Sequence, residues 1–238
     1  MCGRATLIKK KSKIEKRFAA KFQSNDLETY DFEPSYNIAP TQLHPVITGA
    51  DSDHLQFFKW GLIPSWAKDK SIGSKMINAR KETLSEKPSF RNALKKRRCI
   101  IPFDGFYEWK KTSNGLIPHY IFCTNQELFS MAGLWETWKD ENGEPVHSFT
   151  IITMAANKFM APLHHRMPAI LLPGNENTWI DPELTAEEAT QVLLPYPAEL
   201  MNSYSVSREV NKVKNNHPGL IIEEKYPPSL KQGNLFGD

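Results

Sequence analysis

The residue with the most distinctive chemistry in this sequence is Cys2, which directly follows the start methionine. An initiator methionine is usually removed when the next side chain is small, as that of cysteine is. Its removal would leave a free α-amino group and a thiol on one residue, a 1,2-aminothiol. Because the reference pKa of an α-amino group is about 7.7–8.0, a useful fraction is neutral and nucleophilic at cellular pH. The N-terminus therefore predicts a nucleophile that an internal cysteine cannot supply.

Two further kinds of side chain in the sequence are suited to proton transfer. Glu108 lies between Tyr107 and Trp109. A carboxylate flanked by aromatic side chains should be partly desolvated, which raises its pKa and suits it to general acid–base catalysis. His164 and His165 precede an apolar run, and an imidazole is the side chain best suited to proton transfer near neutral pH. Taken singly, a glutamate such as Glu108 is more often simply exposed on a strand, and His164 and His165 could be ordinary loop residues.

Polar and aromatic side chains recur in other short stretches. The stretch "INARKET" holds Asn78, Arg80 and Glu82, and "LHHRMPAIL" adds Arg166. Both arginines could be surface residues, or they could hold phosphates through paired hydrogen bonds. Tryptophans such as Trp66 are more often core residues, but an exposed one offers a face on which an unpaired base can stack.

The composition is that of an ordinary globular protein of 238 residues, of which 40% are hydrophobic and 24% charged. The formal net charge of +3 does not by itself indicate nucleic acid as a partner. Basic residues nevertheless form three runs, at 9–17, 95–98 and 110–111. We interpret each run as solvated surface, because a phosphate-binding face would need the runs to converge in space.

The cysteines and the apolar runs exclude several kinds of protein. Three cysteines without a CxxC pair fit neither a disulfide framework nor a zinc site, so we expect no metal or other cofactor. The basic N-terminal segment lacks the apolar region of a signal peptide, and no apolar run approaches the roughly 18 residues of a membrane helix. The chain is therefore predicted to be cytoplasmic, with reduced thiols and no membrane contact.

Three segments are predicted to be helical. Residues 12–22 have apolar side chains at every fourth position, with Ser12 as a possible N-cap. Residues 88–98 have a proline near the start and a basic last turn. Residues 185–194 begin at a threonine that has Glu188 in the capping-box position.

Short β-type runs lie between these helices and outnumber them. They are rich in β-branched and aromatic residues and are bounded by turn formers, and Asn142–Gly143 is predicted to be a hairpin turn. The runs are "HPVITG", "LQFFKWG", "RCIIPF", "GFYEWKK", "PHYIFCT", "FSMAGLWETW", "SFTIITMAA" and "PAILL". Because strands and helices do not alternate regularly, we predict an α+β fold with a mainly antiparallel, barrel-like or sandwich sheet and a few flanking helices. A single domain would span residues 2–226, followed by a flexible tail at 227–238.

Seven stretches occur in an order that resembles one known family. They are "MCGR", "YNIAP", "WGLIPSWAKD", "NARKET", "IPFDGFYEWK", "HHRMPAIL" and "VSREVNKVKN". Together they resemble the SRAP (SOS response-associated peptidase) family from residue 2 to about residue 215. Seven ordered motifs are far more specific than a single short pattern.

The resemblance implies that the chain recognises abasic sites in single-stranded DNA and joins them covalently. The α-amino group of Cys2 would attack the sugar aldehyde at C1′, and the thiol would close the resulting imine to a thiazolidine. In the family pattern Asn78 would orient the aldehyde or the Cys2 amine, and Glu108 would shuttle protons during imine formation. His164 would help to open the sugar ring, and would assist β-elimination in an associated lyase reaction or slow reversal of the link. Eight positions match residues that would line the DNA channel: Arg4, Asn37, Trp66, Arg80, Arg166, Ser207, Arg208 and Lys214. The adduct would shield the lesion during replication and the SOS response.

The tail contains a second, weaker motif. Gln232, Leu235 and Phe236 fit the Q-x-x-L-F pattern of bacterial sliding-clamp ligands. Docking on a replication clamp would deliver the protein to stalled forks. A chance match in a disordered tail is the simpler explanation, since short motifs often match by chance.

Two other functions are consistent with the same residues. A cysteine-type peptidase or autoprocessing hydrolase could use Cys2, His164 and Glu108, but it would leave the basic runs and tryptophans unexplained. A non-catalytic module could bind single-stranded DNA, and it would keep that affinity in a Cys2→Ala variant. No feature requires an oligomer, so we expect a monomer that associates with the nucleoid when bound to DNA.

Overall fold

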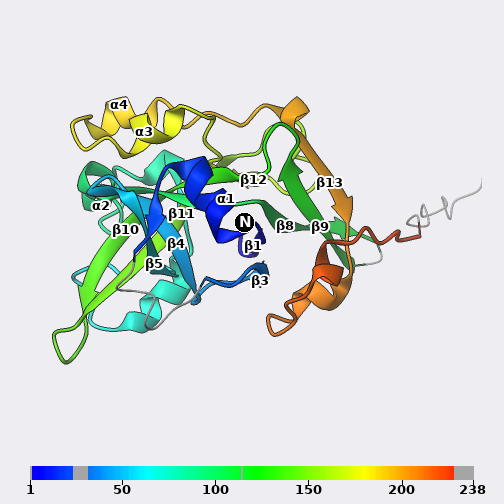
Figure 1. The fold of residues 1–238 in the computed structure, drawn as a ribbon, viewed down its shortest axis with the longest axis horizontal. Helices are drawn as coiled ribbons and strands as arrows, with labels where there is room; N and C mark the ends of the chain where they lie inside the picture. The colour runs from blue at the N-terminus through cyan, green and yellow to red at the C-terminus, as the bar shows by residue number, and fades with distance from the viewer. Residues whose placement is uncertain (1, 24–31, 114, 228–238) are drawn as a thin grey trace, which may run out of the picture.

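Two β-sheets and several short helices make up the described part of the chain, which comprises residues 2–23, 32–113 and 115–227 of a computed structural model (Figure 1). Most strand pairings are antiparallel; the parallel pairs are β11–β5, β11–β6 and β2–β5. The predicted α+β, mainly antiparallel, single-domain class is therefore confirmed. Among the described residues, no helix is both long enough and apolar enough to cross a membrane.

The smaller sheet has five antiparallel strands in the order β13–β9–β8–β1–β3. Along β8, side chains alternate between the two faces, so that Glu108 and Tyr107 point to opposite sides. Tyr107 packs with Tyr120, Val206 and Val210 in a small second core. The strand bounds are β1 Ala5–Leu7, β3 Ser35–Ile38, β8 Gly105–Thr112, β9 Gly115–Cys123 and β13 Met201–Ser205.

The larger sheet closes on itself. Strand β11 pairs with both β10 and β5, which gives a closed ring in the order β11–β10–β7–β4–β5. Near the C-terminal end of β11, β12 pairs with it on the same edge as β10. On the opposite edge, β6 pairs with β11 beyond the point where β5 ends. The strand bounds are β2 Lys21–Phe22, β4 Leu43–Thr48, β5 Asp51–Trp60, β6 Asn78–Arg80, β7 Arg98–Phe103, β10 Phe129–Lys139, β11 Pro145–Ala155 and β12 Arg166–Pro168.

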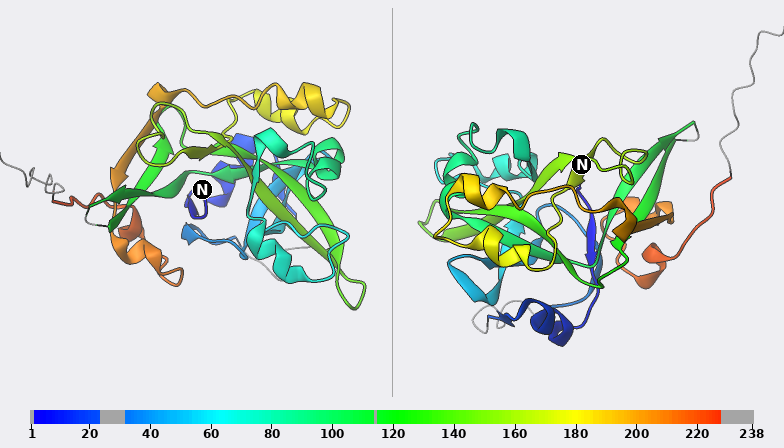
Figure 2. Two further views of the ribbon diagram at one scale, coloured as in Figure 1. Left: turned by 180° about the vertical axis from the view of Figure 1, so that it is seen from behind. Right: turned by 90° about the horizontal axis from the view of Figure 1, so that it is seen from above.

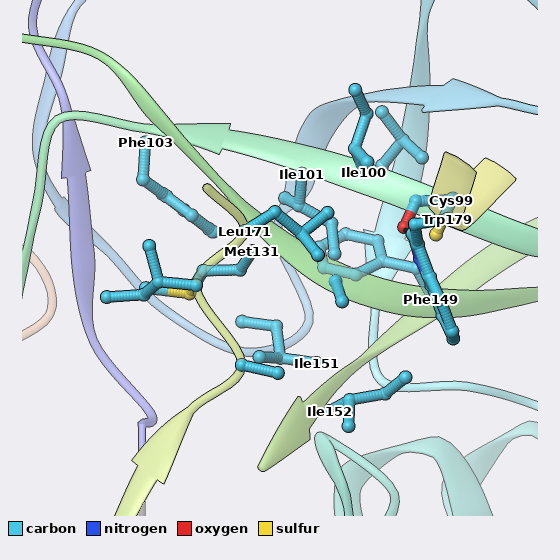
Figure 3. Packing of buried hydrophobic residues seen from close by; sticks show 14 of the residues in the cluster. Cys99, Ile100, Ile101, Phe103, Met131, Phe149, Ile151, Ile152, Leu171 and Trp179 are labelled. Carbon is cyan, nitrogen blue, oxygen red and sulfur yellow. Dashed lines mark hydrogen bonds between the residues drawn. The ribbon is translucent and has the colours of Figure 1, made fainter. Parts of the chain in front are cut away.

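The main hydrophobic core lies within this larger sheet. Buried side chains of β7, β10 and β11, including Ile101 and Phe149, pack with Trp179 of α3 (Asn175–Ile180) (Figure 3). The Trp179 indole N–H donates a hydrogen bond to the Cys99 carbonyl at 2.9 Å. A Cβ atom at Gly133 would approach Ile101 Cδ1 to 2.3 Å, so that this point of the ring has no room for a side chain.

The first helix is shorter than predicted. Helix α1 covers Lys11–Phe18 instead of residues 12–22, because Ala19 adopts a left-handed conformation with φ of 51°. The residues that follow then pair with β5 as strand β2. Ser12 lies inside the helix, and the N-cap position is Lys10, whose side chain makes no capping hydrogen bond.

The other helices agree with the sequence in their caps more than in their lengths. Thr185 and Glu188 form both capping-box hydrogen bonds, but α4 covers only Ala186–Thr190. Helix α2 covers Arg91–Lys96, which is shorter than the predicted 88–98 because β7 begins at Arg98. Helix α3 and five 3₁₀ segments were not predicted; the segments are η2 Lys70–Lys75, η3 Lys81–Thr83, η4 Ala198–Leu200, η5 Arg208–Asn211 and η6 Pro218–Ile221.

The predicted hairpin turn is confirmed, whereas one predicted strand is largely absent. Gly143 has a φ of 84° in the turn that joins β10 to β11. The run "PAILL" contributes only its first residue to β12, and Ile170 then forms an isolated bridge with Met131.

Much of the positive charge in two of the three basic runs is used within the protein. Carboxylates pair with four of their side chains: Lys9 and Lys13 with Glu127, Arg17 with Glu176, and Arg97 with Glu136. The buried Arg98 guanidinium donates to main-chain carbonyls, among them those of Trp179 and Leu94. Arg17, Arg97 and Arg98 are therefore held within the fold, whereas the lysine pairs with Glu127 lie at the surface.

Candidate active site

Cys2 is buried and lies three residues before the start of β1, the blue strand next to the N label in Figure 2. The N-terminal segment is held against β8 by the Tyr107 amide, which donates to the Arg4 carbonyl at 2.9 Å. Cys2 is 1% exposed, and this burial raises the pKa of its thiol to about 12, with the negative charge of Glu108 acting in the same direction. The thiol is therefore fully protonated at neutral pH.

Asn78 binds the main chain of Cys2 directly. It is the first residue of β6, which runs parallel to β11 with Asn78 opposite Ile151. Its side-chain amide donates to the Cys2 carbonyl at 2.8 Å. The side-chain carbonyl of Asn78 is also buried, but it accepts no hydrogen bond from the described residues. One hydrogen-bond acceptor therefore remains available beside the N-terminal residue.

Glu108 places a buried carboxylate near the same residue. It is 5% exposed in β8, two residues beyond Phe106, which pairs with Ala5 of β1. The burial inferred from its aromatic sequence neighbours is confirmed. Its negative charge influences the pKa of both Cys2 and His164, so Glu108 lies close to both side chains.

His164 completes the group from the segment just before β12. The Arg166 amide donates to His164 Nδ1 at 2.9 Å, and the Arg166 carbonyl lies 3.3 Å from the same nitrogen; the shorter contact favours the neutral tautomer with its proton on Nε2. Burial lowers the pKa of His164, and the negative charge of Glu108 opposes this effect. The exposed His165 stacks on His164 with ring centroids 4.3 Å apart. In the neutral state His164 can therefore act as a hydrogen-bond donor through Nε2.

Arg4 and Asn37 connect the N-terminal strands with the C-terminal segment. Arg4 Nη1 donates to the Asn37 side chain at 2.8 Å and to the Val210 carbonyl at 2.6 Å. Asn37 is 2% exposed, and its amide donates to main-chain carbonyls that include that of Asn215 at 2.7 Å. The predicted contact of Asn37 with DNA does not fit this placement, because its side chain is buried and occupied by these bonds.

The other predicted DNA contacts differ in their accessibility. Trp66 is 58% exposed, and Arg80 is exposed two residues beyond Asn78, on the same side of β6. Ser207 caps η5, and Arg208 is exposed with its guanidinium 5.5 Å from the ring centroid of Tyr226. Lys214 is also exposed, in the segment that Asn37 holds near β3.

Arg166 points inward. Its side chain is 12% exposed and forms two hydrogen bonds with Glu82, at 2.7 and 2.8 Å. This pair was missed from the sequence, because nothing in the two motifs indicates that they lie side by side.

The tail residues Gln232, Leu235 and Phe236 lie outside the described residues. Within the described ranges, no three His, Cys, Asp or Glu side chains are grouped so that they could hold a metal ion.

Comparisons with known proteins match nearly the whole chain. A family model described as SOS response associated peptidase (SRAP) matches residues 1–213. The abasic site processing protein YoqW of Bacillus subtilis (strain 168) is 46% identical over 224 residues, which cover 93% of this chain and 99% of YoqW. The abasic site processing protein HMCES of Gallus gallus is 32% identical, with 93% of this chain and 77% of HMCES covered. A crystal structure of a protein from Bacteroides thetaiotaomicron has a TM-score of 0.86 at 31% identity, with 94% and 100% covered.

Proposed function

The chain belongs to the SOS response associated peptidase (SRAP) family, and on this basis we propose that it recognises abasic sites in single-stranded DNA and links itself to them covalently. The names of its relatives support abasic sites as the substrate. The observation that carries the proposal is the convergence of Asn78, Glu108 and His164 on Cys2. In this proposal, residues 2–226 form the family domain.

The order of the chemical steps follows from the protonation state of Cys2. With the thiol protonated, the α-amino group exposed by removal of Met1 is the available nucleophile. It adds to the sugar aldehyde, and loss of water gives an imine. The thiol sulfur then adds to the imine carbon, and the thiol proton passes to the nitrogen, which closes a thiazolidine. Because this closure is intramolecular, it is entropically favoured and replaces a hydrolysable imine with a durable link.

Each of the three surrounding side chains can assist a different part of this sequence. The side-chain carbonyl of Asn78, which accepts no hydrogen bond from any described residue, can accept one from the amine and orient it. The buried carboxylate of Glu108 can accept a proton from the amine and return it to the departing hydroxyl. The Nε2–H of His164 can donate to the ring oxygen of the sugar and so favour the open aldehyde. The same groups could support the lyase reaction expected of the family.

The peptidase alternative is less consistent with the electrostatics of the site. A cysteine peptidase needs a thiolate, whose pKa is usually lowered by a neighbouring positive charge. Here burial and Glu108 raise the pKa of the Cys2 thiol by more than the charge of the N-terminus and the backbone hydrogen bond of Arg4 lower it. The non-catalytic DNA-binding alternative predicts no covalent adduct and does not explain why three polar groups surround Cys2.

The test incubates the protein with single-stranded DNA that carries one abasic site and then runs a denaturing gel. We expect a shifted band that is absent with intact DNA and absent for Cys2→Ala. Cys2→Ser keeps the amine and should give an adduct that is far less durable. No shifted band with the wild-type protein would overturn the proposal, and so would a crosslinked species whose intact mass still includes Met1.

The remaining predictions on partners stand beside this proposal. Trp66, Arg80, Arg208 and Lys214 are exposed and can contact bases or phosphates.

For the tail, we keep the hypothesis that Leu235 and Phe236 dock on a sliding clamp. Changing both to alanine should abolish pulldown of the clamp, and unchanged pulldown would refute the hypothesis. A monomeric, cytoplasmic protein that joins the nucleoid through DNA stays a prediction.

A further inference from the structure

An ion pair between Arg166 and Glu82 joins two segments that carry the proposed catalytic residues; the Arg166 side chain is 12% exposed and the Glu82 side chain 51% exposed. Glu82 lies in η3, directly after β6, which begins with Asn78. Arg166 begins β12, two residues after His164. Both terminal nitrogens of the Arg166 guanidinium donate to the two Glu82 carboxylate oxygens, at 2.7 and 2.8 Å. Such paired hydrogen bonds fix the orientation of both side chains.

The pair spans the strand that separates these two segments. Thr153 of β11 lies opposite Arg80 of β6 on one edge and opposite Pro168 of β12 on the other. Arg166 Nη2 also donates to the Thr153 carbonyl at 2.6 Å. The guanidinium therefore lies across the edge of β11 and attaches β12 to both β11 and η3.

The main chain of the same arginine contacts the catalytic histidine. The Arg166 amide donates to His164 Nδ1 at 2.9 Å, whereas the Arg166 carbonyl lies 3.3 Å from the same nitrogen and would accept from it in the other tautomer. The position of the Arg166 main chain therefore decides which nitrogen of the neutral ring carries the proton. The main chain of Arg166 is held by pairing with Ala155 of β11. Its side chain is held by the hydrogen bonds to Glu82 and Thr153.

We propose that Glu82 is a positioning residue: by holding the Arg166 side chain, it keeps the Arg166 amide on His164 Nδ1 and so keeps His164 in its Nε2–H form. The lowered pKa of Glu82, caused mainly by the hydrogen bonds from Arg166, keeps the carboxylate charged at neutral pH. The kinetic part of the inference rests on the proposed function; the structural part does not. The competing explanation is that Glu82 merely occupies Arg166 until a DNA phosphate displaces it.

The test compares Glu82→Gln with Glu86→Gln. Both variants remove one negative charge from the segment after β6, but Glu86 is exposed and takes no part in binding Arg166. A general effect of charge on DNA binding is therefore shared by the two variants. Glu82→Asp keeps the carboxylate on a shorter side chain and should restore part of what Glu82→Gln loses.

Two measurements follow His164 independently. Nitrogen-15 NMR of histidine-labelled protein, assigned with a His164→Asn variant, reports which ring nitrogen is protonated. The second measurement is the rate of crosslinking at saturating abasic DNA, together with Kd for intact single-stranded DNA. We expect Glu82→Gln to give a mixture of tautomers and a saturating rate about ten-fold lower, since a misplaced general acid loses part of its contribution. Glu86→Gln should keep the Nε2–H form and the wild-type rate.

The outcomes separate the explanations. If Glu82→Gln keeps a single Nε2–H tautomer and the saturating rate of Glu86→Gln, Glu82 does not position His164. If it instead tightens DNA binding well beyond Glu86→Gln with no loss of rate, Glu82 competes with phosphate and the proposal is wrong. If the wild-type protein forms no adduct, the proposed function fails, while the NMR comparison still decides whether Glu82 controls the tautomer.

Discussion

At the scale of single residues, the site combines an unreactive, protonated thiol with side chains that can assist the amine of the same residue. Burial keeps the Cys2 thiol protonated, so that reactivity passes to the amine, whose ordinary pKa lies near neutrality. Asn78, Glu108 and His164 add an acceptor, a carboxylate and an N–H donor. Outside this group, Trp66 offers an exposed aromatic side chain.

Trp66 should contribute to DNA binding without contributing to stability. Its side chain is 58% exposed, so Trp66→Ala removes little buried surface. If a base stacks on the indole, the variant should bind single-stranded DNA more weakly by about 1–3 kcal/mol, while its melting temperature stays at the wild-type value. Fluorescence anisotropy and thermal melting check the two parts. Unchanged affinity would remove Trp66 from the DNA-binding surface.

At the scale of elements, some boundaries could be predicted and others could not. The capping box at Thr185 and the turn at Gly143 depend on local hydrogen bonds and φ angles, so residue types alone indicate them. Short strands such as β6 exist because a neighbour pairs with them, in this case β11. Helix α1 ends early because residues 21–22 pair with β5 as a strand instead of extending the helix. The local sequence pattern does not indicate this long-range pairing.

The catalytic residues illustrate the same limit. Cys2, Asn78, Glu108 and His164 come from four separate parts of the chain, and spacing does not reveal that they meet. The chemistry of Cys2, Glu108 and His164 made them candidates, but only the resemblance to a family grouped them with Asn78 as one site. The resemblance assigned Asn37 to the DNA channel, but its burial depends on contacts with the C-terminal segment that motifs do not show.

The contact between β4 and β7 should make stability depend on pH. His44 of β4 bonds to the Pro102 carbonyl of β7 at 2.7 Å and stacks on Phe103 with centroids 4.4 Å apart. Burial lowers the pKa of His44 to about 4, with the bond to Pro102 opposing this effect. The unfolded chain, with a histidine pKa near 6.5, binds the proton more readily. The stabilisation is therefore present above about pH 6.5 and is lost as the pH falls toward 4.

The predicted size of this effect is about 3 kcal/mol for a fully buried ring. Urea unfolding at pH 7 and pH 4.5 measures it. A His44→Gln variant should be less stable at pH 7 but should lose less stability between the two pH values. His217→Gln, at an exposed histidine, is the control and should follow the wild type. An equal pH dependence in all three proteins would contradict this role of His44.

At the scale of the whole molecule, the closed ring of strands acts as the support on which the site is assembled. Strand β11 belongs to the ring and also carries β6 and β12 on its edges. The five-stranded sheet brings β1 and β8, and with them Cys2 and Glu108. Because the two sheets supply different catalytic residues, the site exists only when both are folded and packed together.

A chain that ends at Pro227 should therefore fold and react normally. Every side chain of the proposed site precedes this residue, and within the described part of the chain both core clusters are formed by residues before it. We expect the truncated protein to form the abasic-site adduct at the wild-type rate and to melt within about 2 °C of the full chain. A markedly lower melting temperature would place part of residues 228–238 in the folded domain.

The burial of Cys2 also has a consequence for the order of events during synthesis. In the folded protein this residue is 1% exposed and lies under a sheet whose strands β8 and β9 are translated about a hundred residues later. The nascent chain offers an accessible N-terminus to an aminopeptidase before these strands are made. A chain that kept Met1 would have no free α-amino group on Cys2 and could not form the adduct. The proportion of active molecules is then set by how completely Met1 is removed, before any damaged DNA is met.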